Sequence, residues 1–401
     1  MLPLFSLQEA SALDHRLIKE AALSESLLID AAASGAFEKA KEHLVGKRVL
    51  FVVGKGNNGS DALEMARLAL SSSSSVRVLV TSEKGNEENL RRRSLLPSSC
   101  FTTTVEPADT IVDGLFGFGF HGEMEPYARS LVDAINCASA FVVSLDVPSG
   151  FLVEADQTVT FMCRKLPLYD PRRRGESGLI SYVNPGFPEE KILSTPVSRY
   201  LLEESDYRKL DLKASDYKNT RGHLLVCGGS DRYPGAPILS CLSAFHSGAG
   251  LVSLLSVPSV LEKAYASYPS IMGVKKDAVD FSRFSAVLVG PGWDEGDKEL
   301  LSRIAESGKP TVVDADALKL MEGIHFHGKG VLTPHLGEFK TLKRILGVPD
   351  SDTETELKEV AHLTGSVVVL KASSLWITDG EAVYVYDGSN PSLGVAGSGD
   401  T

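Results

Sequence analysis

The stretch at residues 48–61, RVLFVVGKGNNGSD, decides the fold of the first half of the chain. Arg48–Val53 is a short apolar run, which is typical of a strand buried on both faces of a parallel sheet. A glycine-bearing turn follows at residues 54–61, and residues 62–70 have the composition of a helix. This order predicts an α/β unit with the turn at the carboxyl edge of its sheet.

The same pattern extends to both sides of this stretch. Residues 7–44 carry apolar side chains at helical spacing and are predicted to form two helices. Further strands are expected at residues 76–80, 110–112 and 141–145, with a helix near 127–136. The alternation of strands and helices predicts a doubly wound α/β sheet that binds ligands at the carboxyl ends of its strands.

A polar, charged stretch at residues 202–219 separates the two halves of the chain. After it the alternation restarts, with strands predicted at residues 223–227, 251–256, 286–289, 311–313, 330–332 and 367–370 and a helix at 237–247. At about 150 residues per domain, a chain of 401 residues is expected to hold two or three domains. We therefore predict two α/β domains, residues 1–203 and 204–401.

Charge and composition exclude several classes of protein. Lys and Arg number 41 and Asp and Glu 52, and the net charge of −11 argues against electrostatic attraction to nucleic acid or anionic lipid. No apolar run approaches the roughly 18 residues of a membrane-spanning helix, and the first residues lack a secretory pattern. The five cysteines form no CxxC pair. We expect a cytoplasmic protein with no nucleic-acid or membrane partner.

Three biased runs are expected to face solvent. Residues 71–75 are five serines, which are typical of a loop between a helix and a strand. Residues 91–93 and 172–174 are arginine triplets in an acidic chain. A solvated surface is the simplest interpretation of each.

Polar residues follow three predicted strands of the first half. The 54–61 turn can offer backbone amides to a phosphate, but it lacks the GK[ST] of a P-loop and does not match GxGxxG. Asp113 and Asp146 each end an apolar strand and precede a glycine-containing turn. A glycine turn alone can be purely structural, and a lone strand-end aspartate is more often a helix cap. Because three such ends meet at one edge of one sheet, we predict a site there.

The second half carries glycine and acidic groups of its own. The segments CGGSD at 227–231, VGPG at 289–292, DAD at 314–316 and TPH at 333–335 each follow a predicted strand, and the chain ends in GSGDT. A glycine-flanked aspartate can act as a base on a hydroxyl while nearby amides hold a transferring phosphate. Taken alone, GSGD is also compatible with a disordered tail, and His335 with a structural histidine.

Together these segments resemble the bifunctional NAD(P)H-hydrate repair enzymes. The resemblance is carried, in chain order, by GKGNNGSDAL, VDGLFGFG, LDVPSG, KNTRGHLLVCGGSDRYPGAP, HSGAGLV, VGPG, VVDADAL, LTPHLGEF and AGSGD. It implies a Rossmann-like three-layer epimerase domain that interconverts the R and S hydrates NADHX and NADPHX. It also implies a ribokinase-like dehydratase domain that uses ADP or ATP with magnesium, and a homo-oligomer.

In the N-terminal domain the resemblance implies a substrate site and a potassium site. The implied substrate-binding residues are Asn57, Asn58, Gly59, Ser60, Asp61, Gly117, Phe118, Gly119, Phe120, His121, Gly122, Glu123 and Asp146. The implied potassium ligands are Asn58, Asp113 and Ser149, whose oxygen atoms suit a hard cation. Asp146 is the implied acid/base residue, because moving a hydroxyl between the faces of the ring needs proton transfer and no redox cofactor.

In the C-terminal domain the resemblance implies three kinds of residue. Hydrate contacts are implied at Ala236, Gly292, His335 and Asp400, and nucleotide contacts at Lys371, Ala372, Ser373, Ser374, Leu375 and Gly399. Asp400 is also the implied catalytic base. Phosphorylation of the ring hydroxyl would make it a good leaving group.

The sequence departs from the family pattern in four places. Ser60 and Ala372 stand where the family has glycine, and the stretch 150–155 is shorter. The family also continues with a helical segment beyond GSGD, so we expect a C-terminal domain truncated at Thr401, which leaves its dehydratase activity open. Two alternative functions are therefore kept: a ribokinase-like small-molecule kinase, and a catalytically silent nucleotide-binding relative.

Overall fold

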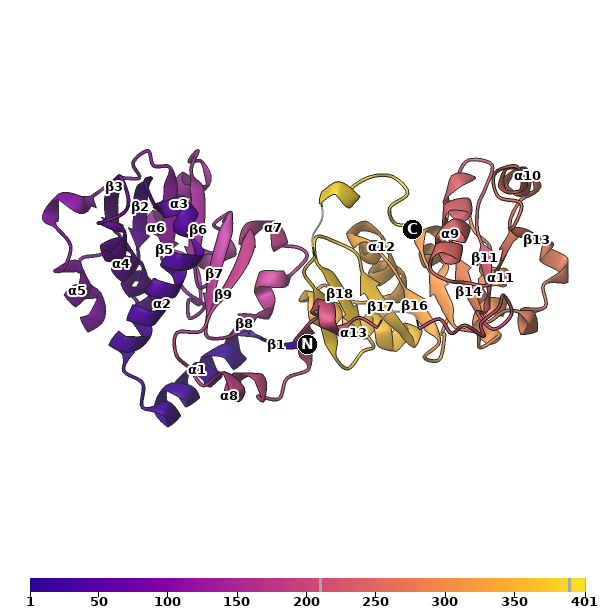
Figure 1. Ribbon diagram of the computed structural model, residues 1–401, viewed down its shortest axis with the longest axis horizontal. Coiled ribbons are helices and arrows are strands. Elements are labelled where there is room, and N and C mark those ends of the chain that lie inside the picture. Colours follow the sequence, from indigo (N-terminus) through magenta and orange to yellow (C-terminus); the bar gives the residue numbers. More distant parts are fainter. Residues whose placement is uncertain (209–210, 389–390, 401) are drawn as a thin grey trace. The chain divides into compact units, whose positions relative to one another are not determined.

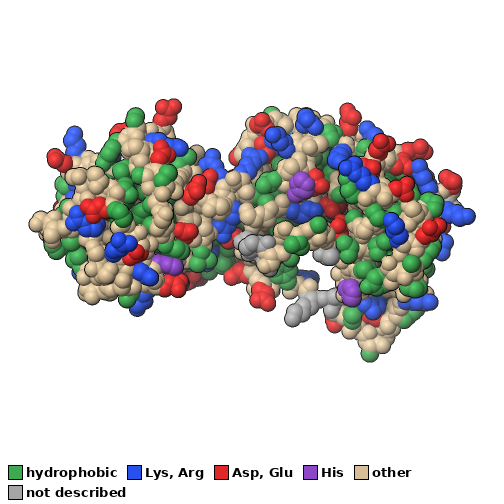
Figure 2. Space-filling model, turned by 90° about the horizontal axis from the view of Figure 1, so that it is seen from above, with side chains coloured by type: hydrophobic (Ala, Val, Ile, Leu, Met, Phe, Trp, Pro, Cys, Tyr) green, Lys and Arg blue, Asp and Glu red, His purple; other side chains and the backbone are tan. Residues whose placement is uncertain are grey.

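The computed structural model describes residues 1–208, 211–388 and 391–400. These residues form two compact units, one spanning Leu2–Tyr200 and the other running from Leu201 together with Met1 (Figure 1). Each unit is built on a largely parallel sheet, so the α/β prediction is confirmed for both halves. No helix among the described residues has both the length and the apolar character needed to cross a bilayer. On the face drawn in Figure 2, basic side chains are interspersed with acidic ones.

The N-terminal unit has a parallel sheet of strand order β4-β3-β2-β5-β6-β7-β9. Its strands are β2 (Arg48–Val53), β3 (Ser75–Val80), β4 (Phe101–Thr102), β5 (Thr110–Gly114), β6 (Phe141–Leu145), β7 (Gln157–Phe161) and β9 (Leu179–Val183). A separate parallel pair joins β1 (Leu2–Phe5) to β8 (Arg164–Lys165). The central strand β2 lies between β3 and β5, so its backbone is paired on both edges.

Helices cover both faces of this sheet (Figure 1). The α-helices of this unit are α1 (Leu7–Ala21), α2 (Glu25–Lys39), α3 (Lys41–Leu44), α4 (Asn57–Ala69), α5 (Glu87–Arg93), α6 (Pro126–Asn136), α7 (Arg174–Ser177) and α8 (Glu189–Leu193). Phe51 and Val53 of β2 share one core cluster with alanines of α2 and α4. Leu50 and Val52 belong to a second cluster with α6. Alternate residues of β2 therefore face opposite helical layers, which explains its continuous apolar run.

Helix α4 begins five residues earlier than predicted, at Asn57 instead of Ala62. The reason is the small size of Gly59: a Cβ on this residue would lie only 2.0 Å from the Gly54 carbonyl oxygen. The first helical turn can therefore pack directly on the end of β2. As a result Asn57–Asp61, expected in a turn, lie in the first turns of the helix.

The C-terminal unit has the strand order β13-β12-β11-β14-β15-β16-β17-β18-β19. These strands are β11 (His223–Cys227), β12 (Leu251–Leu255), β13 (Met272–Val274), β14 (Ala286–Val289), β15 (Thr311–Val313), β16 (Gly330–Leu332), β17 (Ser366–Leu370), β18 (Leu375–Thr378) and β19 (Val383–Tyr386). Pairing is parallel from β13 to β17 and antiparallel in the hairpin that follows. Its α-helices are α9 (Gly235–His246), α10 (Pro258–Ser267), α11 (Lys298–Glu306), α12 (Leu336–Leu346) and α13 (Thr353–Thr364).

Candidate functional site

Asp113, near the end of β5, is the centre of a buried hydrogen-bond group. Its carboxylate accepts hydrogen bonds from the Ser149 hydroxyl (2.6 Å) and backbone N–H (2.9 Å) and from the Ser144 hydroxyl (2.8 Å). The Leu115 N–H also donates to it, at 3.2 Å. Burial raises the pKa of Asp113, and these hydrogen bonds oppose the rise. The group ties the end of β5 to the turn after β6.

Asp146 directly follows β6 and lies almost fully buried at the same edge of the sheet. Its φ of +67° is uncommon for a residue with a side chain. Oδ2 accepts a hydrogen bond from the Phe118 N–H at 2.9 Å, and Oδ1 lies 2.8 Å from Lys165 Nζ. A Cβ on Gly117 would lie 3.0 Å from Oδ2, so the loop approaches the carboxylate closely at this glycine.

Asn58 is a buried amide at the start of α4. The residue is 8% exposed, and neither its side-chain oxygen nor its nitrogen has a hydrogen-bond partner among the residues that the structure describes. The Cβ position of Gly117 is 3.6 Å from Asn58 Cγ and 3.0 Å from Asp146 Oδ2, so both side chains face the same loop. An unpaired buried amide destabilises a fold. A ligand or ion that contacts the Asn58 oxygen would supply the missing interaction.

Asp61 lies one turn further along α4 and is also buried. Burial, followed by the negative charge of Asp146, raises the pKa of Asp61 well above its usual range, while Arg92 opposes the rise. A buried carboxyl group whose pKa is raised in this way is a candidate functional residue.

The implied potassium ligands fit a hard cation in their chemistry. Asn58, Asp113 and Ser149 each carry a side-chain oxygen atom, which is the kind of ligand that potassium takes. The Asn58 amide oxygen is unpaired, whereas Asp113 and Ser149 bond to each other. The ion would therefore supply the missing partner of Asn58.

Residues 117–123 form the loop between β5 and α6. Gly117, Phe118 and Phe120 are half-buried, and Phe120 stacks on Phe116 with ring centroids 4.3 Å apart. Gly119, His121, Gly122 and Glu123 are exposed. The structure thus places only the start of this loop against Asp146.

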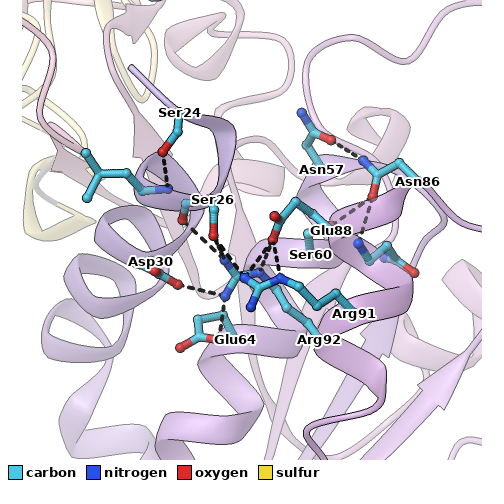
Figure 3. Close-up of polar contacts among 12 residues, drawn as sticks. Ser24, Ser26, Asp30, Asn57, Ser60, Glu64, Asn86, Glu88, Arg91 and Arg92 are labelled. Atoms are coloured by element: carbon cyan, nitrogen blue, oxygen red, sulfur yellow. Dashed lines mark hydrogen bonds and ion pairs between the residues drawn. The ribbon is translucent and has the colours of Figure 1, made fainter. Parts of the chain in front are cut away.

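Arg92 anchors α5 to α4 and α2 (Figure 3). Its guanidinium contacts Glu64 of α4 at 2.5 Å and Asp30 of α2 at 2.8 Å, and the residue is 1% exposed. The prediction of a solvated arginine run is therefore wrong for Arg92, and also for Arg174, which is buried. Each triplet has one buried arginine, and a run of identical letters cannot show which one it is.

The other end of α5 contacts the predicted substrate residues of α4 (Figure 3). Asn86 caps α5 and donates from its side-chain amide to the Asn57 side chain. The Ser60 hydroxyl lies 3.3 Å from the Gly56 carbonyl and 3.4 Å from Asn86 Oδ1. The serine that replaces the family glycine is thus bonded within the α4–α5 contact.

The C-terminal unit has a second aspartate–lysine pair. Asp314 follows β15, and its Oδ1 accepts hydrogen bonds from Thr333 Oγ1 (2.7 Å) and Lys371 Nζ (2.8 Å). A Cβ on Gly399 would lie 3.8 Å from the same Nζ. Burial, then the charge of Asp314, raises the pKa of Asp400, and Lys371 lowers it. The structure thus brings Lys371, Gly399 and Asp400 together.

Besides Asp400, the predicted hydrate contacts of this unit lie in two places. A Cβ on Gly292, whose φ is +63°, would lie 3.3 Å from the Ala236 Cβ, so these two residues adjoin. His335 caps α12 by accepting from the Gly337 N–H at 3.0 Å. It also lines an open cavity of about 270 Å³ together with Asp316, Leu318, Lys319, Gly337, Glu338 and Thr341.

The predicted nucleotide contacts begin at the end of β17. The Lys371 N–H donates to the Pro334 carbonyl at 2.8 Å, which joins this end to the segment before His335. Ser374 is buried, Ala372 and Leu375 are half-buried, and Ser373 is exposed. These four residues form the turn into β18 and its first position.

Comparison with known proteins gives the same assignment for both halves. A family model for the YjeF-related protein N-terminus matches residues 24–166, and one for NAD(P)H-hydrate dehydratase matches residues 224–401. The bifunctional NAD(P)H-hydrate repair enzyme Nnr of Coxiella burnetii is 30% identical over 419 residues, covering 96% of this chain and 85% of the relative. The chain belongs to the bifunctional NAD(P)H-hydrate repair enzymes. The resemblance found in the sequence is thereby confirmed.

Further members of the repair-enzyme family and solved structures also match. Nnr of Dictyoglomus turgidum is 27% identical over 461 residues, covering 100% of this chain and 87% of the relative. An ADP/ATP-dependent NAD(P)H-hydrate dehydratase from Bacillus subtilis, co-crystallized with ATP/Mg2+, is 27% identical with a TM-score of 0.42, covering 47% of this chain and 72% of that chain. A ribokinase-like superfamily protein from Enterococcus faecalis has a TM-score of 0.45 at 22% identity, covering 51% and 76%.

Two charged residues of this repair-enzyme chain escaped the sequence predictions. Lys165 was given no role, although it stands four residues after the apolar strand β7. Asp314 was noted only as following a strand. Its signal was the same as that of Asp113, an acidic residue at the end of a buried parallel strand.

Proposed function

We propose that this chain repairs hydrated nicotinamide nucleotides through two activities. The N-terminal unit interconverts the R and S forms of NADHX and NADPHX, and the C-terminal unit dehydrates the S form with ADP or ATP. Family membership supports both activities. For the epimerase, the observation that carries the proposal is the gathering of Asn58, Asp113, Asp146 and Ser149 at one edge of one sheet.

In the epimerase, Asp146 holds or releases the proton of the substrate hydroxyl. Its Oδ2 is directed by the Phe118 N–H toward the 117–123 loop. The start of α4 has no side-chain cap within the described part of the chain, so the backbone N–H groups of its first turn suit the phosphates of a dinucleotide. A potassium ion on Asn58, Asp113 and Ser149 would supply positive charge beside the bound nucleotide.

In the dehydratase, Asp400 is the base acting on the hydrate hydroxyl. Lys371, paired with Asp314, presents an ammonium group beside Gly399, where a nucleotide phosphate would bind. Magnesium would enter with the nucleotide, and the carboxylates of Asp314 and Asp400 are oxygen ligands of the kind that it takes. We also propose domain limits of 1–203 and 204–401, a cytoplasmic location and a homo-oligomeric state.

A racemic hydrate tests both activities at once. The full chain is incubated with R,S-NADHX, ADP, magnesium and potassium, and the two epimers and NADH are separated by chromatography. We expect complete conversion, because the epimerase refills the S form that the dehydratase consumes. Conversion of the S half alone would overturn the epimerase assignment, and interconversion without NADH would overturn the dehydratase assignment. No change in either epimer would overturn the proposal as a whole.

A further inference from the structure

Lys165 is a fully buried lysine to which the proposed mechanism gives no role. Its side chain is 0% exposed, and Nζ lies 2.8 Å from Asp146 Oδ1. The contact with Asp146 is an ion pair without hydrogen-bond geometry among the described residues, whereas the ammonium donates hydrogen bonds to Thr160 Oγ1 (3.0 Å) and to the carbonyls of Phe161 (2.9 Å) and Cys163 (3.4 Å). A buried ammonium strongly destabilises a protein unless it is both paired and hydrogen-bonded. These contacts therefore fix the position of the Lys165 ammonium beside the Asp146 carboxylate.

The two oxygens of the Asp146 carboxylate have different partners. Oδ1 faces Lys165, whereas Oδ2 accepts the Phe118 N–H and approaches Gly117. The Phe118 ring lies 5.1 Å from Lys165 Nζ, so one residue of the loop contacts both members of the pair. A turn of the carboxylate would break the ion pair and the hydrogen bond together.

Two further carboxyl groups, those of Asp14 and Asp61, are affected by the negative charge of Asp146. Burial raises the pKa values of Asp14 and Asp61, and the charge of Asp146 raises both further. Lys165 opposes the rise at Asp14, and Arg92 opposes it at Asp61. Lys165 thus acts on the charge of Asp14 as well as on that of Asp146.

We infer that Lys165 is a positioning residue for the epimerase reaction. Its ammonium holds the Asp146 carboxylate so that Oδ2 is the oxygen presented to the substrate hydroxyl. Lys165 itself lies behind the carboxylate, on the side of β7 and β8, and acts through Asp146. This inference rests on the proposed epimerase function.

The test compares Lys165→Met with Lys191→Met in the full chain. Lys191 is an exposed lysine of the same unit that pairs with Glu20 at 2.6 Å, so it controls for loss of an ammonium. Rates of R-to-S interconversion of NADHX give kcat and KM. We expect Lys165→Met to lower kcat about 100-fold with KM within about threefold, because positioned proton transfer contributes about 10²–10⁴-fold. The control is expected to stay within about twofold of the natural chain.

Several outcomes would overturn the inference. A folded Lys165→Met protein with unchanged kcat would show that Asp146 needs no lysine, and a raised KM with unchanged kcat would make Lys165 a binding residue instead. If Lys165→Met does not fold, Thr160→Val decides, because it removes one acceptor of the ammonium at nearly constant volume. We then expect kcat to fall about threefold to tenfold at constant KM, and an unchanged kcat overturns the inference. Failure of the natural chain to interconvert the epimers would instead overturn the proposed function.

Discussion

The two units each contain an aspartate–lysine pair at the carboxyl ends of their strands, and the two pairs differ in their access to water. Asp146–Lys165 and Asp314–Lys371 both have a closest N–O distance of 2.8 Å. The lysine side chain is 0% exposed in the first pair and 31% exposed in the second. The two ion pairs therefore differ in strength although their N–O distances are equal.

Solvent decides what each lysine can do. The interaction of two charges is many times stronger in a dry interior than in water, but each buried ion then depends on its partner. Lys165 is therefore committed to Asp146. Lys371 is screened by water and can exchange part of its contact with Asp314 for a phosphate oxygen. One pair orients a catalytic group, and the other is open to a ligand.

The largest effect is expected at the acidic member of the buried pair. Asp146→Asn keeps the shape of the side chain but removes the proton acceptor, so epimerase kcat should fall about 10³-fold. The measurement is interconversion of purified R-NADHX, with Asp133→Asn on the exposed face of α6 as the matched control. Retention of activity within about tenfold would assign the proton transfer to another group.

Next in size is the loss of stability when a dry pair is broken. Lys165→Met should destabilise the N-terminal unit by about 3–5 kcal/mol, because it leaves the buried carboxylate of Asp146 without its cation. Arg92→Met should destabilise it less, because Glu64 keeps its ion pair with Arg67. Hydrogen exchange of β6 and α4 amides measures this unit separately from the other. If the hydrogen-exchange protection of these amides is unchanged in both variants, the buried pair contributes no more to stability than the more exposed pair does.

A smaller loss of stability is expected when the more exposed pair, Asp314–Lys371, is broken. Lys371→Met should destabilise the C-terminal unit less than Lys165→Met destabilises the N-terminal unit, because the Lys371 side chain is 31% exposed and the buried Asp314 keeps its hydrogen bond from Thr333. Both tryptophans, Trp293 and Trp376, lie in this unit, so their fluorescence in urea reports on it. The KM for ADP should rise about tenfold at the same time. A stability loss as large as that of Lys165→Met would contradict the comparison.

The smallest effect is a shift in pH dependence. Asp400 acts as a base only when deprotonated, so dehydratase kcat/KM should fall as the pH drops through its pKa. The charge of Asp314 raises that pKa and Lys371 lowers it. Asp314→Asn should therefore move the acid limb to lower pH and Lys371→Met to higher pH. Glu306→Gln, on an exposed position of α11, should leave the limb unchanged, and shifts of the opposite sign would exclude Asp400 as the titrating base.

Strand positions were predictable because buried parallel strands are continuous apolar runs that end in glycine or acidic residues. Arg48–Val53, Phe141–Leu145 and His223–Cys227 have the predicted bounds. The start of α4 was not predictable, because Gly59 belongs to the helix only through its close approach to Gly54. The sequence does not distinguish a glycine that permits tight packing from a glycine that makes a turn.

The candidate site divides in the same way. Asp113 and Asp146 could be placed at one edge from the chain pattern, since all parallel strands of a sheet end on the same side. Three features of the site depend on segments far apart in the chain. Asn58 has no partner among the described residues, Arg92 is buried, and Lys165 contacts Asp146. Local patterns of apolar and polar residues specify strands, helices and the edge where ligands bind. The partner and the hydration of each charge follow from packing, because burial is a property of the whole surroundings and of no single stretch of residues.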